Sequence, residues 1–398
     1  MSDTAPSSQA SPATSDSAST AVLWADPQRE AVFHGWLDRI AVAQQLAPAS
    51  LRLASADASF RRYLRIDFIG ASAGLSNPSR IIMDAPPDRE DCRAFVKVAG
   101  LMAEAGLNVP RVLAWDEAQG FMLLSDLGSQ TMLDVIAQRP RAEEPPQSGE
   151  TTHALYMEAA DALITWQLAS RPDVLPPYDD ALLSRELALF PQWYIAQHRG
   201  IDVDAALRGK LDEMFSLIKA SNLQSLAGAR VFVHRDFMPR NLMAPQSVAR
   251  TLLASPTALP CAPETRIGIL DFQDAVYGPI SYDIASLMRD AFLSWEEEFV
   301  LDITVRYWQK ARQAGLPVGE DFGEFYRAVE WMGLQRHLKI LGIFVRLTLR
   351  DGKPQYLADT PRFIKYARST AARYRQLGPL LVLLDEIEGN ETRVGYTF

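Results

Sequence analysis

The sequence has few cysteines, no long apolar run and no excess of positive charge. Cys92 and Cys261 are its only two cysteines, so neither a disulfide framework nor a thiolate zinc cluster is expected. The longest apolar run near the C-terminus, residues 380–384, is far shorter than the roughly 20 residues of a membrane helix. A net charge of −9 argues against broad binding to nucleic acid or to anionic lipid.

The first 20 residues differ in composition from the rest. They are almost entirely Ser, Ala, Thr, Pro and Asp, which bury too little apolar surface to fold, so residues 1–20 are predicted to be a disordered tail. They also lack the basic and apolar regions of a signal peptide, which favours a cytoplasmic protein. The whole chain of 398 residues is 48% apolar and 22% charged, which is enough for two or three domain-sized units with buried cores.

A helix and then a strand-rich region follow the tail. Asp26-Pro27 is typical of a helix start, and the apolar residues from Phe33 to Ile40 recur at helical spacing. Next come five short runs of β-forming residues, at 51–55, 60–68, 80–85, 111–115 and 121–125. A helical pattern at 91–105 lies between the third and the fourth of these runs. The order β-β-β-α-β-β is typical of the small, nucleotide-gripping lobe of a protein-kinase-like fold.

From residue 126 onward the pattern is mostly helical. Apolar residues recur at helical spacing in the segments 155–166 and 207–218. Two short strands are predicted at 231–234 and 266–272, with a loop at 244–265 between them. The remainder of the chain reads as further helices.

The sharpest motif follows the first of these two strands. His234, Asp236 and Asn241 match H-x-D-x-x-x-x-N, the catalytic loop of kinase-like phosphotransferases. In such a loop one carboxylate accepts a proton from the attacking hydroxyl, and an amide oxygen reaches the metal on the phosphates. Asp271 stands at the end of the second strand, where such folds keep the Asp that binds Mg²⁺. An H-x-D motif alone is common, and a lone Asp after a strand is most often part of a turn or a cap. The two features together, in this order, predict kinase-like phosphoryl transfer.

Two long segments carry a family resemblance. HRDFMPRN (234–241) and LDFQDAVYGPISYDIASL (270–287) resemble the aminoglycoside phosphotransferase superfamily, which includes choline and homoserine kinases. Further segments resemble one group within it, the bacterial anomeric kinases that phosphorylate N-acetylmuramate and N-acetylglucosamine at C1 in peptidoglycan recycling. These segments are DASFRRYLR (57–65), MDAPPDRED (83–91), LFPQWY (189–194) and GLQRHLKILGIFVRLTLRDGK (333–353).

The resemblance implies a fold, cofactors and catalytic residues. The implied fold is α+β and two-lobed, like that of protein kinases. A small antiparallel sheet with one helix, at 21–125, would grip the nucleotide, and a larger, mostly helical lobe at 126–398 would hold the catalytic loop, the metal site and the sugar pocket. ATP and Mg²⁺ are the implied cofactors. Asp236 is the implied catalytic base, and Asn241 and Asp271 are the implied Mg²⁺ ligands.

Two further residues are implied to support the catalytic loop. His234 follows an apolar strand, so we expect it to be buried and structural rather than catalytic. Asp283 lies where the superfamily begins a helix after the metal loop, and it would either cap that helix or brace the catalytic loop.

The nucleotide-binding part departs from the kinase pattern at two points. The turn at 55–59 between the first strands contains no glycine. Its small residues would still let backbone N–H groups approach a phosphate, and Ser59 would add a hydroxyl. The third strand also ends in Met83-Asp84, where kinases usually have a Lys that pairs with the phosphates, so another cation must replace it.

The nearest cations are three arginines of the second strand. Alternation along a strand would send Arg61 and Arg65 to one face and Arg62 to the other. A solvated edge is the alternative role for each of them. The resemblance also implies that the adenine lies against the backbone around 124–126, which makes Asp126 a nucleotide-binding candidate along with Ser59, Arg61 and Arg65.

The predicted sugar contacts rest on residue type. Neutral sugars are bound by carboxylates and amides that hydrogen-bond their hydroxyls and by aromatic rings that stack on the sugar ring. Asp179, Glu186 and Trp193 have these properties and lie in one segment, and Arg336 could pair with the lactyl carboxylate of N-acetylmuramate. An ordinary salt bridge or core aromatic is the alternative role for each.

The leading hypothesis is an ATP- and Mg²⁺-dependent kinase that acts on an N-acetyl amino sugar at C1. Among enzymes, the alternative is a kinase of another small alcohol, such as an aminoglycoside, choline or homoserine. Outside enzymes, the alternative is a nucleotide-binding pseudokinase, which the missing Lys favours. The expected partners are ATP and a small amino sugar, without nucleic acid or membrane, and the expected state is a monomer or a weak dimer.

Overall fold

The computed structural model describes residues 22–56, 61–70, 78–137, 150–245 and 266–389. The predicted tail at 1–20, most of the predicted loop at 244–265 and Ser59 lie outside these ranges. The chain divides into two compact units, Met1–Cys92 with Val112–Asp126, and Arg93–Arg111 with Leu127–Phe398. The segment between the third and fourth strands therefore belongs to the second unit, although the first unit surrounds it in the sequence.

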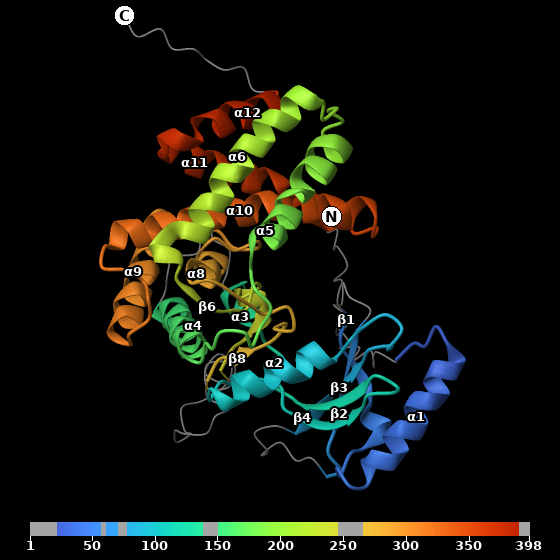
Figure 1. Cartoon of the computed structure of the whole chain (residues 1–398). Helices are drawn as coiled ribbons and strands as arrows, with labels where there is room; N and C mark the ends of the chain where they lie inside the picture. Colours follow the sequence, from blue (N-terminus) through green and yellow to red (C-terminus); the bar gives the residue numbers. More distant parts are fainter. Residues whose placement is uncertain (1–21, 57–60, 71–77, 138–149, 246–265, 390–398) are drawn as a thin grey trace, which may run out of the picture. The chain divides into compact units, whose positions relative to one another are not determined.

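The first unit is built on a five-stranded antiparallel sheet of order β1-β2-β3-β5-β4 (Figure 1). Its strands are β1 (Arg52–Ala56), β2 (Arg62–Asp67), β3 (Ser79–Asp84), β4 (Val112–Asp116) and β5 (Phe121–Ser125). The five strands predicted from runs of β-forming residues are confirmed, with small differences at their ends. A short 3₁₀ turn, Pro48–Ser50, precedes β1.

Helix α1 (Pro27–Ala41) covers one face of this sheet. It begins where predicted, because the Asp26 side chain accepts a hydrogen bond from the Gln28 N–H and satisfies a free donor of the first turn. Its buried residues pack with alternate residues of β2, β3 and β5, because successive side chains of a strand point to opposite faces. This apolar cluster contains Phe33, Trp36, Leu37, Ala41, Leu46, Leu64, Ile66, Ile82, Phe121 and Leu123.

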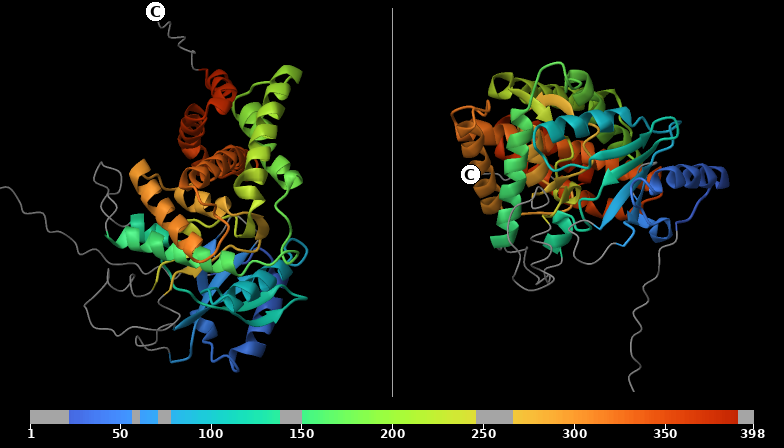
Figure 2. Two further views of the ribbon diagram at one scale, coloured as in Figure 1. Left: turned by 60° about the vertical axis from the view of Figure 1, so that its left-hand side comes forward. Right: turned by 90° about the horizontal axis from the view of Figure 1, so that it is seen from below.

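The second unit is mostly helical. Its α-helices are α2 (Arg93–Glu104), α3 (Met132–Ala137), α4 (Glu150–Leu168), α5 (Asp180–Leu187), α6 (Ala205–Gln224), α8 (Ser281–Met288), α9 (Glu297–Gln313), α10 (Phe322–Leu349), α11 (Thr360–Arg373) and α12 (Gly378–Glu388). A π-helix spans Phe190–His198, and short 3₁₀ turns span Ser225–Gly228, Pro239–Asn241, Pro354–Asp359 and Arg375–Leu377. Helices α4 and α9 lie side by side (Figure 2), joined by the hydrogen bond between His153 and Asp302 and by the ion pair Lys310–Asp161.

Two small antiparallel pairs of strands carry the sequence motifs. Strand β6 (Arg230–Val233) pairs with β9 (Val276–Pro279), and β7 (Leu242–Met243) pairs with β8 (Gly268–Ile269). The strand predicted at 266–272 is therefore too long. Only two of its residues pair with β7, and the backbone of Asp271 then turns into the left-handed region with φ 62°.

Helix α10 is the centre of the second unit, and nearly all residues from Phe325 to Val345 are buried. A helix that is buried almost all round must be covered by other elements on several sides. Its residues share one core cluster with residues of α5, the π-helix, α6, α11 and α12. At Gly342 the packing is so close that an added Cβ would lie 2.3 Å from the carbonyl oxygen of Leu189.

Gly342→Ala should therefore destabilise the protein, because the methyl group would meet the backbone of Leu189 rather than a side chain that can move. We expect a loss of about 3 kcal/mol in the free energy of unfolding. Denaturant unfolding would measure it. Gly209→Ala is the control, because Gly209 is exposed in α6 with nothing within 4 Å of an added Cβ, and it should gain about 0.5–1 kcal/mol. Equal stability of the two variants would contradict the close packing of α10.

In the described part of the chain, every helix is too short or too polar to span a lipid bilayer.

Candidate active site

The loop that contains Asp236 begins directly after β6. Val231, Phe232 and Val233 are buried, so the end of this strand is fixed in the core of the second unit. The loop then closes in the 3₁₀ turn Pro239–Asn241, where the Asn241 N–H donates to the Met238 carbonyl at 2.8 Å. A short segment between a fixed strand and a tight turn can hold two polar side chains in defined positions.

His234 is fully buried and links the two halves of the motif. Its Nε2 lies 2.9 Å from the carbonyl oxygen of Leu270, and its Nδ1 accepts the backbone N–H of Asp236 at 3.2 Å. An acceptor at Nδ1 and a donor at Nε2 are the arrangement of a neutral imidazole. Burial lowers the pKa of His234, which agrees with the neutral form. The expected burial of His234 is confirmed, and its two contacts are consistent with a bracing role.

Asp283 braces the loop from the first turn of α8. Its side chain is fully buried and accepts the backbone N–H groups of His234 at 2.7 Å and of Arg235 at 3.0 Å. Burial raises the pKa of Asp283, although these two hydrogen bonds oppose the change. Of the two roles expected for Asp283, the structure shows the brace: α8 has no side-chain cap at Ile280.

The predicted metal ligands Asn241 and Asp271 lie next to each other. Asn241 Nδ2 donates to the Asp236 carbonyl at 2.9 Å and lies 3.4 Å from Asp271 Oδ2. The amide oxygen of Asn241, the atom that could bind a metal, takes no part in these two contacts. Asp271 is exposed, and its Oδ1 accepts a hydrogen bond from Gln273 at 2.8 Å.

This pair of oxygen donors fits Mg²⁺. Oxygen is the ligand atom that Mg²⁺ prefers, and the ion is usually held by one or two carboxylates together with substrate phosphates and waters. Among the described residues, no three His, Cys, Asp or Glu side chains come together as a metal cluster. The protein would therefore supply Asp271 and Asn241, and the phosphates and waters would supply the rest.

Asp236 is half-buried near three cations. Burial alone would raise the pKa of its carboxyl, but the charges of Lys339, Arg336 and Arg235 outweigh burial and hold the pKa below its usual range. The group is thus a carboxylate at neutral pH, the form that can accept a proton.

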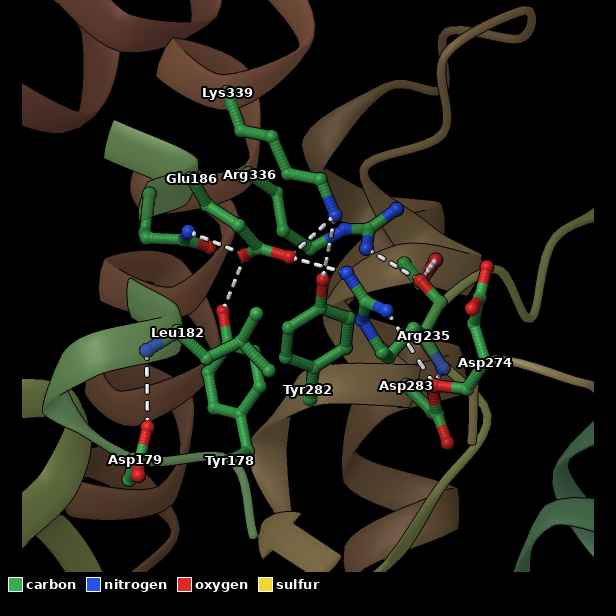
Figure 3. A network of polar contacts seen from close by, with 12 residues as sticks. Tyr178, Asp179, Leu182, Glu186, Arg235, Asp274, Tyr282, Asp283, Arg336 and Lys339 are labelled. Carbon is green, nitrogen blue, oxygen red and sulfur yellow. Dashed lines mark hydrogen bonds and ion pairs between the residues drawn. The ribbon is translucent and has the colours of Figure 1, made fainter. Parts of the chain in front are cut away.

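The neighbours of Asp236 form one polar network (Figure 3), which α5, the loop, α8 and α10 share. At its centre, the buried carboxylate of Glu186 accepts four hydrogen bonds from Tyr178, Gln335, Arg235 and Lys339. Its pKa is lowered because the charges of Lys339 and Arg235 outweigh the effect of burial.

The chain matches a known protein family over most of its length. The sequence model described as "Phosphotransferase enzyme family" matches residues 50–251 and 262–321. The chain belongs to this phosphotransferase family. The family resemblance and the enzyme class predicted from the catalytic motif are confirmed.

The chain is similar over most of its length to two curated bacterial proteins named N-acetylmuramate/N-acetylglucosamine kinase. That of Pseudomonas aeruginosa is 46% identical over 356 residues, which are 88% of this chain and 94% of the relative. That of Neisseria meningitidis is 44% identical over 373 residues, 93% of this chain and 100% of the relative.

A solved choline kinase from Cryptosporidium parvum is similar in fold, with a TM-score of 0.54. It is 12% identical, and the match covers 89% of this chain and 99% of that chain. At this identity the likeness shows the fold alone, and it confirms the predicted protein-kinase-like architecture with a small antiparallel sheet and a mostly helical remainder.

In this phosphotransferase, the four predicted sugar contacts have different surroundings. Glu186 and Arg336 both contact Arg235, since Arg336 Nη1 donates to its carbonyl oxygen at 2.6 Å. Asp179 is exposed and caps α5 by accepting the Leu182 N–H at 2.9 Å. Trp193 lies in the π-helix and packs against the core cluster around α10. The sugar-binding role of these four residues stays a prediction.

The predicted nucleotide contacts of the first unit form ion pairs. Arg61 Nη2 lies 3.0 Å from Glu90, and Arg65 donates to both carboxylate oxygens of the buried Asp126, at 2.6 and 3.1 Å. Asp84 lies at the position where kinases have the phosphate-pairing Lys, and it also forms ion pairs. Its buried carboxylate accepts hydrogen bonds from Arg29 and from Arg62, each through two nitrogens.

The predicted alternation holds for Arg62, whose guanidinium lies 3.9 Å from the ring centroid of Trp24, a residue packed against the α1 cluster. Sequence reasoning missed Lys339 and the Arg29–Asp84 pair. A lysine inside the apolar stretch 334–347 was a usable signal, because a buried ammonium requires a carboxylate partner.

Proposed function

We propose that this phosphotransferase uses ATP and Mg²⁺ to phosphorylate the anomeric C1 hydroxyl of N-acetylmuramate, N-acetylglucosamine or both, in peptidoglycan recycling in the cytoplasm. The observation that carries the substrate class is the 44–46% identity to kinases of that name over nearly their full length. The intact loop of Asp236, Asn241 and Asp271, fixed by His234 and Asp283, supports catalysis over a pseudokinase.

Asp236 is the proposed catalytic base. It would accept the proton of the attacking hydroxyl while the loop holds that hydroxyl in line with the transferred phosphate. The cations that lower its pKa make it a weak base. An anomeric hydroxyl is more acidic than an ordinary alcohol, so a weak base with modest driving force is sufficient.

Asn241 and Asp271 are the proposed Mg²⁺ ligands. When bound, Mg²⁺ would neutralise charge on the β- and γ-phosphates of ATP. Ser59, Arg61, Arg65 and Asp126 remain the proposed nucleotide contacts. Because Arg61 pairs with Glu90 and Arg65 with Asp126, each arginine would have to share its donors with a phosphate.

The position of phosphate on the product tests this function. With N-acetylglucosamine or N-acetylmuramate, NMR of the product should show phosphate on C1, because Asp236 would deprotonate only the anomeric hydroxyl. The methyl glycoside of N-acetylglucosamine is the matched control, since its C1 oxygen is blocked and no ADP should form.

Two results would contradict the proposal. The first is phosphate on C6 or turnover of the methyl glycoside. The second is an ADP-coupled assay in which choline, homoserine or kanamycin is phosphorylated and the amino sugars are not.

A further inference from the structure

Arg235, the residue before Asp236, has an unusual backbone. Its φ is 79°, in the left-handed region that non-glycine residues rarely adopt. Such a residue costs free energy, of order 1–3 kcal/mol, and persists only where its surroundings fix it. Because Arg235 directly precedes Asp236, its backbone angles set the position from which the Asp236 side chain extends.

Both polar backbone groups of Arg235 are held by side chains of the second unit. The N–H donates to Asp283 of α8 at 3.0 Å. The carbonyl oxygen accepts from Arg336 of α10 at 2.6 Å, and Ser286 Oγ lies 3.5 Å from it. Two helices thus fix the peptide groups on either side of the left-handed residue.

The Arg235 side chain is held by Glu186 of α5. Its Nη2 lies 2.6 Å from Glu186 Oε1, and Lys339 Nζ lies 2.8 Å from the same oxygen. The other oxygen, Oε2, accepts from the Tyr178 hydroxyl at 2.6 Å and from Gln335 at 2.9 Å (Figure 3).

A carboxylate offers about four acceptor positions, and the four donors of this network use them. Glu186 is also only 4% exposed. Its contacts are therefore those of a residue that acts on the protein rather than on a sugar hydroxyl.

Cations and carboxyl groups are equal in number in this network. Arg235, Arg336 and Lys339 are the cations, and Glu186, Asp236 and Asp283 are the carboxyl groups. Buried ion pairs are a poor source of stability compared with apolar packing, because desolvation offsets most of their attraction. Their directional hydrogen bonds do fix geometry, and here that geometry is the backbone before Asp236.

We propose that Glu186 is a positioning residue for phosphoryl transfer: by holding the Arg235 side chain, it fixes the left-handed backbone that presents Asp236 to the acceptor hydroxyl. This inference rests on the proposed function, since it gives Asp236 the role of base. It also departs from the sequence-based prediction, in which Glu186 binds the sugar directly.

Glu186→Gln tests the proposal. The glutamine keeps the shape and one acceptor oxygen, but its NH₂ group would face the donors of Arg235 and Lys339. We expect kcat to fall about 100-fold, the loss that a misplacement near 1 Å can cause. KM for the sugar and for ATP should change by less than about threefold, because neither substrate contact is removed.

The matched control is Glu330→Gln. Glu330 is a buried glutamate of α10 that, like Glu186, accepts from an arginine and a tyrosine, in this case Arg373 and Tyr374. We expect a comparable loss of thermal stability in the two variants and a loss of kcat in Glu186→Gln alone. An equal fall in kcat in both, an unchanged kcat in Glu186→Gln, or a raised sugar KM with an unchanged kcat would each overturn the proposal.

Arg235→Gly keeps the test valid if Glu186→Gln does not fold. Glycine adopts a φ of 79° without strain, so this variant should fold while its backbone before Asp236 is no longer held by Glu186. The expected result is again a large fall in kcat with KM nearly unchanged, and wild-type kcat would overturn the proposal. The wild-type protein distinguishes a failure of the proposed function from a failure of the positioning role of Glu186. The proposed function fails only if the wild type itself does not phosphorylate amino sugars.

Discussion

Asp236→Asn is expected to lower kcat about 10³-fold while the folded structure and ATP binding are retained. The hydrogen bonds that fix this part of the loop use the backbone of Asp236, not its carboxylate. Its N–H donates to His234 Nδ1 at 3.2 Å, and its carbonyl accepts from Asn241 at 2.9 Å. An amide side chain leaves both in place, and it removes the proton acceptor together with one negative charge. Initial rates with an amino sugar and calorimetric titration with ATP would measure the two effects.

Asp180→Asn is the control for this variant. Asp180 is an exposed aspartate of α5 that pairs with Lys219, a residue of α6. Its kcat should equal that of the wild type. If Asp236→Asn retains turnover within a few-fold of the wild type, Asp236 is not the base. If it no longer binds ATP, its loss of activity does not report on proton transfer.

Elements whose signal lies in nearby residues could be predicted from the sequence. The start of α1 is set by Asp26 and its buried face by the spacing of Phe33, Trp36 and Leu37, all within three turns. The extent of a strand depends on its partner, which is distant in the sequence. For this reason the strand predicted at 266–272 is reduced to Gly268–Ile269.

The unit to which a helix belongs also depends on distant residues. Helix α2 lies between two strands of the first unit in the sequence, but it belongs to the second unit. Its Phe95 stacks on Phe272 with ring centroids 4.9 Å apart. Nothing near Phe95 in the sequence indicates this contact. The π-helix at Phe190–His198 likewise follows Leu189, whose backbone packs closely against Gly342 of α10, a residue distant in the sequence.

The candidate site likewise contains residues that the sequence predicts and contacts that it does not. The positions of Asp236, Asn241 and Asp271 follow from a motif whose spacing is itself the signal. The partners of charged residues do not, because Arg235 and Glu186 are 49 residues apart and Arg65 and Asp126 are 61 apart. A sequence shows that a cation is present but not which carboxylate it meets, so the four donors of Glu186 could be identified only from the structure.

Asp271→Asn is expected to remove the Mg²⁺ dependence of ATP binding and to lower kcat about 10³-fold, the equivalent of about 4 kcal/mol of charge stabilisation. Asp271 supplies the only carboxylate of the proposed Asn241–Asp271 pair, and a neutral amide would leave the metal without a charged protein ligand. The backbone should not change, because asparagine accepts the left-handed conformation found here, with φ 62°, more readily than most residues. The side chain would also keep an oxygen for Gln273.

Asp274→Asn is the matched control, an exposed aspartate in the same loop, and it should retain both kcat and Mg²⁺ dependence. Titration of each variant with ATP, with and without Mg²⁺, separates a metal ligand from a general loss of negative charge. An equal loss of kcat and of Mg²⁺ dependence in the two variants would show that local negative charge matters rather than coordination of the metal. Normal Mg²⁺-dependent ATP binding in Asp271→Asn would place the metal elsewhere, and Asn241, whose amide group already donates to the Asp236 carbonyl, would then be a residue that only supports the loop.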